Sequence, residues 1–535
     1  MIPSNYINKL FKENSTIYFC SFLLIFMACF FPKSCGFIDD FIKPKWFVTE
    51  VAGLLLTFIF ILYNLFNTPP KDWEHFISIK NELCKAAVCV SFMEALYVSC
   101  IFFYKGSIIG TFDNSVGLTL SLCTLLPFHF YLFKLYWYSK LKRLFLIISV
   151  ICSIAIIILT QSRTGYICLF LYFSCFIIRV FPRWRKILIL MLSFISIAFI
   201  YLIFKIKTAS SLGRWFILAR SWDLIKENLV CGHGYNTFIQ KYMLKQAEYF
   251  RENLDSQYAW FADEIKHPLN EFILTWVEFG ILGTLLHIGI FIFLFIRLKK
   301  RKDTFSFTFF LSIVSIFIFS LFSYPMTYPL SWVILILCFY VAFNKELKSV
   351  YNRIHFRKIF LVFCLIGILI RSIYLICSFK IENKWYYTYQ NSLRGHSKEM
   401  MQSYDLLYKR LKHNYYFLYN FASEQFYAER YDSALIIANE CMTKWPSYNL
   451  SLLMGDICRH SEKYKESIGY YEQAFYMCPV RFAPLEGLYY SYKKCGMKMK
   501  SDSIAKIIKQ KKIKIYSKEI ERIKQNILED LSQSN

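Results

Sequence analysis

Apolar runs long enough to cross a membrane recur along the chain before residue 380. A transmembrane helix needs roughly 20 such residues. Helices of soluble proteins alternate apolar and polar faces, whereas these runs are apolar on every side. The hydrophobic fraction of 56% also exceeds the roughly 45–50% that is typical of a soluble domain. The chain is therefore predicted to be an all-α polytopic membrane protein rather than a large soluble helical protein.

We expect about eleven spans, each near the length that a bilayer requires. Their approximate bounds are 16–32, 46–66, 84–104, 107–133, 144–160, 165–181, 187–204, 272–296, 305–322, 328–343 and 359–378. The net charge of +26 is concentrated in short loops beside these spans, which membrane topology explains better than a nucleic-acid partner. Four basic clusters then share the cytoplasmic side, at 134–143, 179–186, 297–302 and 345–358. The segments expected on the outer side are 161–165, the loop 205–271, the turn 323–328 and the C-terminal tail.

Neither the cysteines nor the carboxylates have the spacing of a metal site. The 18 cysteines are scattered, mostly in apolar segments where cysteine acts as a small hydrophobe. Asp263, Glu264, Glu271 and Glu278 could group around a metal, but no spacing among them is diagnostic. We therefore expect no metal and no cofactor, and we expect Glu278 to be paired or to face a cavity because it lies in an apolar segment.

Beyond residue 380 the composition becomes that of a soluble helical domain. Aligning Pro446 with Pro479 reveals a repeat, and its small, aromatic and proline positions match a tetratricopeptide repeat. Each such unit is a helix–turn–helix that packs on its neighbours. An unrelated helical bundle is the alternative. The predicted domains are a membrane domain at 1–380 and a periplasmic repeat domain at 381–535.

The polar loop at 205–271 begins with an amphipathic helix. Its apolar stripe consists of Trp215, Leu218, Trp222, Ile225 and Leu229. Arg214 borders this stripe, whereas Arg220 lies nearly opposite and faces solvent or Asp223 and Glu227. A guanidinium beside an apolar face suits a lipid-linked phosphate, because its planar fork matches phosphate oxygens. For Arg214 the alternative is a side chain that extends along the membrane surface.

Three further features of the outer segments bear on function. Arg163 lies between two spans on the side where basic residues are rare, so it is a functional candidate or an arginine at a helix end. His267 can act as a general base, and Asn270 and Glu271 lie beside it at the membrane surface. The turn at 232–234 lacks the context of a nucleotide loop, and its histidine is interpreted as structural.

Five motifs occur in a fixed order. They are Gly110-Thr111-Phe112-Asp113-Asn114, Ser162-Arg163-Thr164-Gly165, Gly213-Arg214-Trp215, Gly232-His233-Gly234-Tyr235-Asn236-Thr237-Phe238, and Asn270-Glu271-Phe272 with Glu278-Phe279-Gly280-Ile281-Leu282-Gly283. This order resembles the O-antigen ligase and polymerase family of bacterial envelope glycosyltransferases. In that family a histidine often precedes the asparagine of the last motif, whereas this chain has Leu269 there and His267 three residues before Asn270.

The resemblance implies a GT-C-like glycosyltransferase in the bacterial inner (cytoplasmic) membrane. Its donor would be a glycan on undecaprenyl diphosphate at the periplasmic face, used without a nucleotide sugar or a metal. An acceptor hydroxyl would attack the anomeric carbon, and the leaving diphosphate would be stabilised by fixed arginines. The residues implied are Arg163, Arg214 and Arg220 for the diphosphate, and His267, Asn270 and Glu271 for the acceptor.

Several functions stay open at this point. The acceptor of the family is lipid A core, another glycan unit or a protein hydroxyl, and transfer to lipopolysaccharide is favoured here over polymerisation. The repeat domain suggests a protein contact, because such stacks present a concave peptide-binding surface. A membrane scaffold that recruits proteins is the non-enzymatic alternative. A transporter is a third, and it predicts broken helices near the bilayer midplane.

Overall fold

The computed structural model describes residues 15–34, 36–66, 73–192, 195, 208–353 and 357–534. All regular elements in these residues are helices. Contacts between residues divide the chain into two compact units. The first comprises Met1–Lys205 and Leu286–Asn383, and the second comprises Ile206–Leu285 and Lys384–Asn535. The chain therefore leaves the first unit at the hydrophilic loop, returns to it, and leaves it again at the tail.

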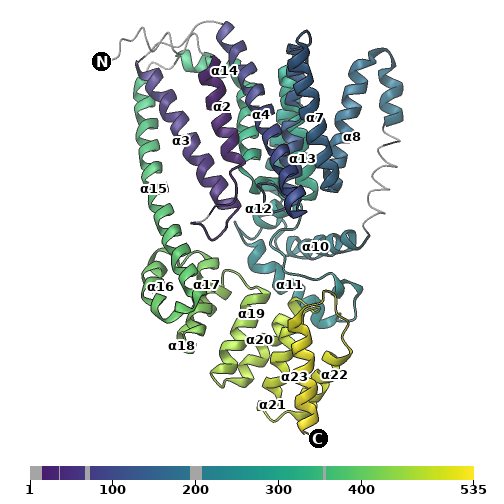
Figure 1. Cartoon of the computed structure of the whole chain (residues 1–535), viewed down its shortest axis with the longest axis vertical. Helices are drawn as coiled ribbons and strands as arrows, with labels where there is room; N and C mark the ends of the chain where they lie inside the picture. The colour runs from purple at the N-terminus through teal and green to yellow at the C-terminus, as the bar shows by residue number, and fades with distance from the viewer. Residues whose placement is uncertain are drawn as a thin grey trace. The chain divides into compact units, whose positions relative to one another are not determined.

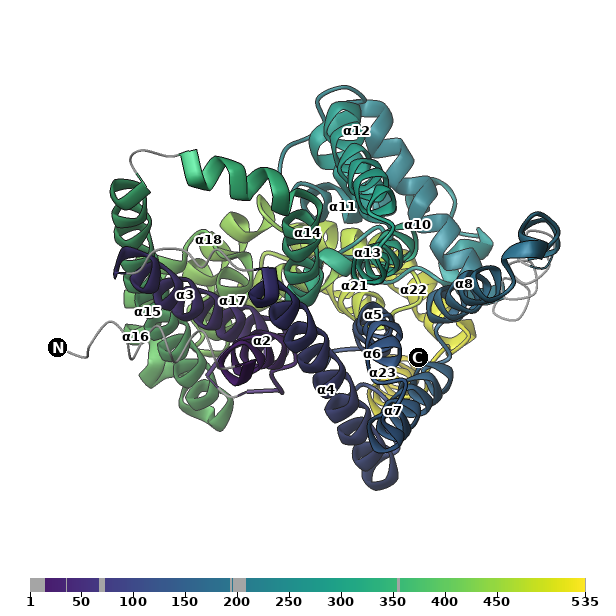
Figure 2. The ribbon, with the colours of Figure 1, turned by 90° about the horizontal axis from the view of Figure 1, so that it is seen from above.

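Long apolar helices make up the first unit. They are α2 (Ser15–Cys29), α3 (Ile42–Phe66), α4 (Trp73–Lys105), α5 (Ser115–Leu125), α6 (Phe128–Leu135), α7 (Lys140–Leu159), α8 (Arg163–Val180), α13 (Thr304–Phe322) and α14 (Pro329–Arg353), with short turns η1 (Pro182–Trp184) and η3 (Pro325–Thr327). Two long helices, α12 (Glu271–Lys300) and α15 (Arg357–Asn391), contribute to both units. Figure 1 shows α2, α3, α4, α7 and α13 running in roughly the same direction, and Figure 2 shows this bundle from above.

The described helices confirm a polytopic membrane protein. Eight of them are long and apolar enough to cross a membrane, and Ser15–Cys29 and Pro329–Phe343 are shorter apolar helices. The span expected at 187–204 falls largely outside the described residues, so the number eleven stays a prediction. The span expected at 107–133 begins only at Ser115, because the residues before it form a loop that Asn114 ends by capping α5.

Three of the basic clusters lie at one end of the first unit. Lys134 donates to Thr304 Oγ1 at 3.3 Å, Arg301 donates to the Ala342 carbonyl at 3.1 Å, and the Arg179 guanidinium lies 4.0 Å from the centre of the Phe307 ring. Clusters that are far apart in sequence therefore meet at the same end of the bundle, as a common membrane side requires.

The tail forms a stack of helices in the second unit. It contains η4 (Ser392–His396), α16 (Ser397–Leu411), α17 (Tyr415–Tyr427), α18 (Tyr431–Met442), α19 (Tyr448–His460), α20 (Tyr464–Met477), α21 (Ala483–Lys494), α22 (Lys498–Gln510) and α23 (Lys518–Ser534). Three successive helix pairs turn in the same way. The turn residues Glu429, Glu462 and Gly496 all have positive φ, and the next residue of each turn donates to a carbonyl five positions earlier. This arrangement is a Schellman turn.

Tyr471 shows how neighbouring pairs of the stack pack. Its side chain is fully buried in α20. A Cβ atom on Gly455 of α19 would approach the Tyr471 ring to 2.6 Å, and a Cβ atom on Gly487 of α21 would also collide with it. One ring therefore fits between two glycines of adjacent pairs. The helix pairs are repeated units, and their identification as tetratricopeptide repeats stays a prediction.

Candidate functional site

The two glycine motifs of the hydrophilic loop interlock through their backbones. α12 is interrupted at Gly280, whose φ of 67° and ψ of −170° are not helical. Such an interruption leaves backbone groups that need new partners. Two hydrogen bonds of 2.8 Å supply them, from His233 N to the Val277 carbonyl and from Gly234 N to the Glu278 carbonyl. Segments 44 positions apart in the sequence thus form one backbone junction.

Only glycine fits at the centre of this junction. A Cβ atom on Gly280 would overlap the Val230 carbonyl. A Cβ atom on Gly232 would lie 2.5 Å from Gly280 N, and both glycines have positive φ. Gly280 lies in a region of φ and ψ that other residues essentially do not adopt. The glycines of these motifs therefore have a structural role.

Two polar side chains complete the junction. The Glu278 carboxylate is buried and accepts hydrogen bonds from the backbone N–H groups of Asn236 and Phe238. The Phe238 N–H belongs to the first turn of α11 (Phe238–Glu252). His233 donates from Nε2 to the Leu224 carbonyl at 2.8 Å and accepts at Nδ1 from Lys241 at 2.9 Å. Both ring nitrogens are thus used in packing the loop, and Glu278 is paired with backbone, as expected for a carboxylate in an apolar segment.

The segment before α12 is a strained turn. Asn270 caps the helix, because its side-chain oxygen accepts from the N–H groups of Phe272 and Ile273 at 2.9 and 3.0 Å. Leu269 has a φ of 56°, which is uncommon for a residue with a bulky side chain. Glu271 is 6% exposed in the first turn of α12, and His267 is half-buried three residues before Asn270. The three expected acceptor-side residues lie within this turn and the first turn of α12, and the Asn270 side-chain oxygen is engaged in the cap.

α10 (Thr208–Glu227) has two apolar faces rather than the single expected stripe. Phe216, Ile217 and Leu224 are buried within the unit. Trp215 is 64% exposed and Trp222 is 41% exposed. The stripe read from the sequence therefore remains partly outside the core of this unit, whereas the face that contains Phe216 packs inward. Arg214 is half-buried next to Trp215.

Arg220 packs against the loop instead of facing solvent alone. Its guanidinium lies 4.3 Å from the centre of the Tyr249 ring and forms an ion pair of 3.0 Å with Asp223. The pairing with Asp223 is one of the two positions expected from the sequence. Cation–π stacking and an ion pair hold the guanidinium in place within the second unit. Through these contacts Arg220 packs α10 against α11.

Side chains of the tail bind the segment that leads to His267. Gln246 of α11 is fully buried, and its amide nitrogen donates to the Asp263 carbonyl at 3.0 Å and to the Met477 carbonyl at 2.6 Å. Side chains of three successive tail units also hold this segment. Lys266 donates to Tyr416 Oη at 2.9 Å, Asn449 donates to Glu264 Oε2 at 3.0 Å, and Arg481 pairs with Asp263 at 2.8 Å. Loop and tail thus form one body, a relation that the sequence did not predict.

Glu264, which lies in the contact between loop and tail, is expected to make the stability of the protein depend on pH. Burial raises the pKa of Glu264 above its ordinary value of 4.5, and the Lys266 charge opposes this shift. Its Oε1 is buried without a hydrogen-bond partner among the described residues. A raised folded-state pKa means that the folded protein binds more protons, so stability falls as pH rises above 4.5. Glutamine at this position cannot ionise. Relative to the parent protein, Glu264→Gln should therefore be increasingly stabilising as the pH rises from 4.5 to the raised folded-state pKa of Glu264, and stabilising by a constant amount above that pKa.

Glu248 of α11 provides a control of opposite sign. Its hydrogen bond with Lys245 lowers the pKa of Glu248, so Glu248→Gln should slightly destabilise the protein above its unfolded-state pKa. Thermal unfolding of both variants in detergent from pH 4 to pH 8 tests this. A Glu264→Gln variant that is less stable than the parent at pH 7 would contradict the assignment.

In the first unit, Arg163 is the first residue of α8. Ser162 caps this helix by accepting from Gly165 N at 3.3 Å. A Cβ atom on Gly165 would lie 2.5 Å from Thr119 Cγ2, so the glycine lets α8 approach α5 closely. The Ser-Arg-Thr-Gly motif thus places a half-buried guanidinium at a helix N-terminus, where backbone N–H groups favour anions.

The loop before α5 and the turn at 323–328 meet around Asn114. Its amide nitrogen donates to Tyr324 Oη at 3.0 Å and to Tyr328 Oη at 3.1 Å. Tyr328 Oη also donates to the exposed Asp113 carboxylate at 2.8 Å. These contacts join the Gly-Thr-Phe-Asp-Asn motif to the turn at 323–328.

Two buried charges that sequence reasoning missed hold this loop. Glu94 accepts from Thr111 N at 2.9 Å and from Thr111 Oγ1 at 3.1 Å. Lys45 is 1% exposed and donates to the carbonyls of Phe31 and Thr111. Glu94 lies inside the expected span 84–104, and a charge at such a position is the signal that could have identified it, whereas Lys45 lies just before the span 46–66.

The structure therefore divides the expected residues between its units. Arg214, Arg220, His267, Asn270 and Glu271 belong to the second unit, and Arg163 belongs to the first. Within the described ranges, no three His, Cys, Asp or Glu side chains are grouped as metal ligands.

Fold and sequence pattern together define a polytopic α-helical membrane protein with a large hydrophilic loop. Residues 148–288 match the O-antigen ligase family. The match covers the second part of α7, α8, the hydrophilic loop and the first part of α12, and so contains all six expected site residues. It supports an enzyme with O-antigen ligase-like glycan transfer at the level of the family. No curated protein matched the chain.

Proposed function

We propose that the protein transfers a glycan from undecaprenyl diphosphate to an acceptor hydroxyl at the periplasmic face of the bacterial inner membrane, with a GT-C-like fold. The observation that carries this proposal is the match at 148–288, whose ends enclose both arginine motifs and the turn before α12. The interlocked junction at Gly280 supports it, because it rigidly connects that turn to α10 and α11.

Arg163 and Arg214 bind the donor diphosphate in this proposal. During transfer the bond between the anomeric carbon and the diphosphate oxygen breaks, and its electron pair leaves with the diphosphate. Guanidinium groups stabilise such charge because they form bidentate hydrogen bonds with phosphate oxygens. Arg163 adds the N-terminus of α8. Arg220 is assigned a positioning role, since its guanidinium is stacked on Tyr249.

His267 or Glu271 accepts the proton of the acceptor hydroxyl. The acceptor oxygen forms the new bond to the anomeric carbon, and the proton passes to the base. Glu271 is nearly buried at the start of α12 and His267 lies on the tail-held segment, so tertiary contacts restrain both residues. Asn270 orients this turn through its cap.

We propose lipid A core as the acceptor, in a reaction of lipopolysaccharide biosynthesis, with another glycan unit or a protein as the alternatives. The tail is proposed to consist of tetratricopeptide repeats. Its contacts with the loop favour a role in positioning the turn over protein recruitment alone. The break in α12 does not favour the transporter alternative. The backbone carbonyls at the break accept hydrogen bonds from N–H groups of the loop, so they are not left to bind a substrate or an ion.

A deletion strain of the source bacterium tests the proposal. Its lipopolysaccharide and glycoproteins are compared on gels, and lipid-linked glycans are extracted, with and without the wild-type gene. One polymer-bearing species should disappear while the undecaprenyl diphosphate-linked glycan accumulates, and the missing species identifies the acceptor. Unchanged surface glycans without donor accumulation would favour the scaffold function instead.

A further inference from the structure

The first unit contains a cavity that the proposed reaction does not use. It has a volume of about 480 Å³ and lies between α2, α4, α6 and α7. Its lining residues are Phe19, Lys85, Val88, Cys89, Leu132, Tyr136, Leu141, Lys142, Phe145 and Leu146. We propose that this cavity binds the headgroup of an anionic phospholipid.

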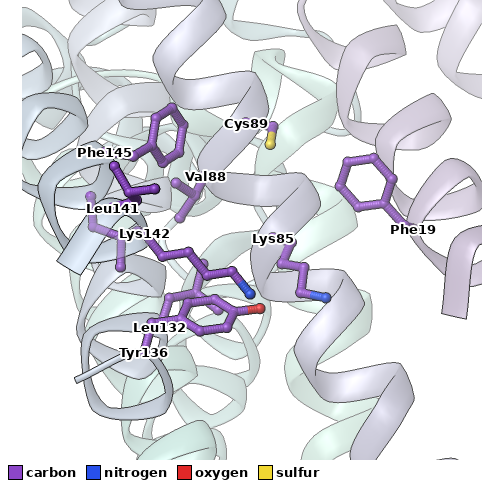
Figure 3. A pocket seen from close by; sticks show the side chains of 10 residues that line it. Phe19, Lys85, Val88, Cys89, Leu132, Tyr136, Leu141, Lys142 and Phe145 are labelled. Atoms are coloured by element: carbon purple, nitrogen blue, oxygen red, sulfur yellow. The ribbon is translucent and has the colours of Figure 1, made fainter. Parts of the chain in front are cut away.

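Three polar groups provide the headgroup site. The ammonium groups of Lys85 and Lys142 and the hydroxyl of Tyr136 point toward the same space (Figure 3). Lys142 Nζ lies 4.4 Å from the centre of the Tyr136 ring, which holds it at the cavity. Lys85 also pairs with Glu82 at 2.7 Å. Two ammonium groups and one carboxylate leave a net charge of +1, which suits a phosphodiester of charge −1.

Apolar walls indicate a lipid rather than a free anion. The seven other lining side chains, from Phe19 to Leu146, are aliphatic, aromatic or cysteine. α4 and α7 are long and apolar enough to cross a membrane, and Leu141 and Phe145 are exposed on α7. Acyl chains can pack against these apolar side chains, which inorganic phosphate cannot do. The occupant is therefore a phospholipid.

The position of the cavity is consistent with this occupant. Lys142 belongs to the basic cluster at 134–143, which the sequence places on the cytoplasmic side. Anionic lipids of that leaflet are attracted to basic groups beside membrane helices. Arg163 follows the far end of α7, whose 20 residues span about 30 Å. The lipid site is thus separate from the residues proposed for glycan transfer.

Native mass spectrometry of the purified full chain tests the proposal. Phosphatidylglycerol and phosphatidylcholine with identical acyl chains are added in turn, and bound lipid is counted at increasing collision energy. Wild type should retain phosphatidylglycerol at least tenfold better than phosphatidylcholine. Lys85→Gln/Lys142→Gln should abolish this preference, whereas the control Lys140→Gln/Arg185→Gln, which removes two exposed charges outside the cavity, should keep it.

Three outcomes would overturn the lipid site. They are equal retention of both lipids by wild type, an undiminished preference in the double variant, and displacement of the lipid by excess inorganic phosphate. Lys142→Gln alone is the second variant should the double variant fail to fold, and it should weaken retention about threefold or more. None of these readouts depends on glycan transfer, so failure here leaves the proposed reaction unaffected.

Discussion

Replacement of Arg163 or Arg214 by alanine is expected to lower glycan transfer about 100- to 1,000-fold, the usual effect of removing one group that stabilises transition-state charge. Both arginines lie in the segment that matches the O-antigen ligase family. Arg163 stands at the capped N-terminus of α8, and Arg214 is half-buried on α10 beside an exposed tryptophan. Lysine keeps the charge but loses the planar fork, so Arg→Lys variants should retain intermediate activity.

The readout is the amount of transferred glycan in the complemented deletion strain, normalised to the amount of each variant in the membrane. Arg185→Ala is the matched control, because it removes an exposed arginine from the predicted cytoplasmic side. Arg220→Ala should reduce thermal stability as well, since it removes the stacking on Tyr249 and the ion pair with Asp223. Full transfer by both Arg163→Ala and Arg214→Ala would exclude the two-arginine mechanism.

Gly280→Ala is expected to lower the free energy of unfolding by about 2–6 kcal/mol. Strain at a backbone conformation reserved for glycine contributes about 1–3 kcal/mol, and overpacking against the Val230 carbonyl adds about 1–3 kcal/mol. The carbonyl belongs to the backbone, so it cannot move aside as a side chain would. A domain is stable by only about 5–15 kcal/mol, so Gly280→Ala should remove a large share of the second unit's stability.

Gly289→Ala is the control, because it lies on the same helix with open space around the added Cβ atom. It should be neutral or stabilise the helix by up to about 1 kcal/mol. Fluorescence-detected thermal unfolding and limited proteolysis of the loop, both on detergent-purified protein, measure the difference. A Gly280→Ala variant as stable and as protease-resistant as Gly289→Ala would show that the α12 junction does not form.

Some structural features of this protein could be predicted directly from its sequence. Apolar runs and their lengths predict the membrane helices, because every backbone group of a spanning helix is satisfied within the helix itself. The period that aligns Pro446 with Pro479 also relates Glu429 to Glu462, and both of these residues have positive φ in their turns. In each case neighbouring residues along the chain carry the information.

The remaining features required the tertiary structure. The glycines at 232 and 280 are needed because two distant backbones meet, and no local periodicity records that meeting. Likewise, the sequence indicated an apolar stripe that contains Trp215, but α11 and the tail cover the face of α10 that contains Phe216. Gln246 illustrates the same point, since its hydrogen bond to the Met477 carbonyl joins loop and tail. The sequence by itself determined that the chain is a polytopic α-helical membrane protein and which motifs are present. Long-range packing decided which residues of those motifs are structural, because burial and backbone pairing between distant segments arise only when those segments meet.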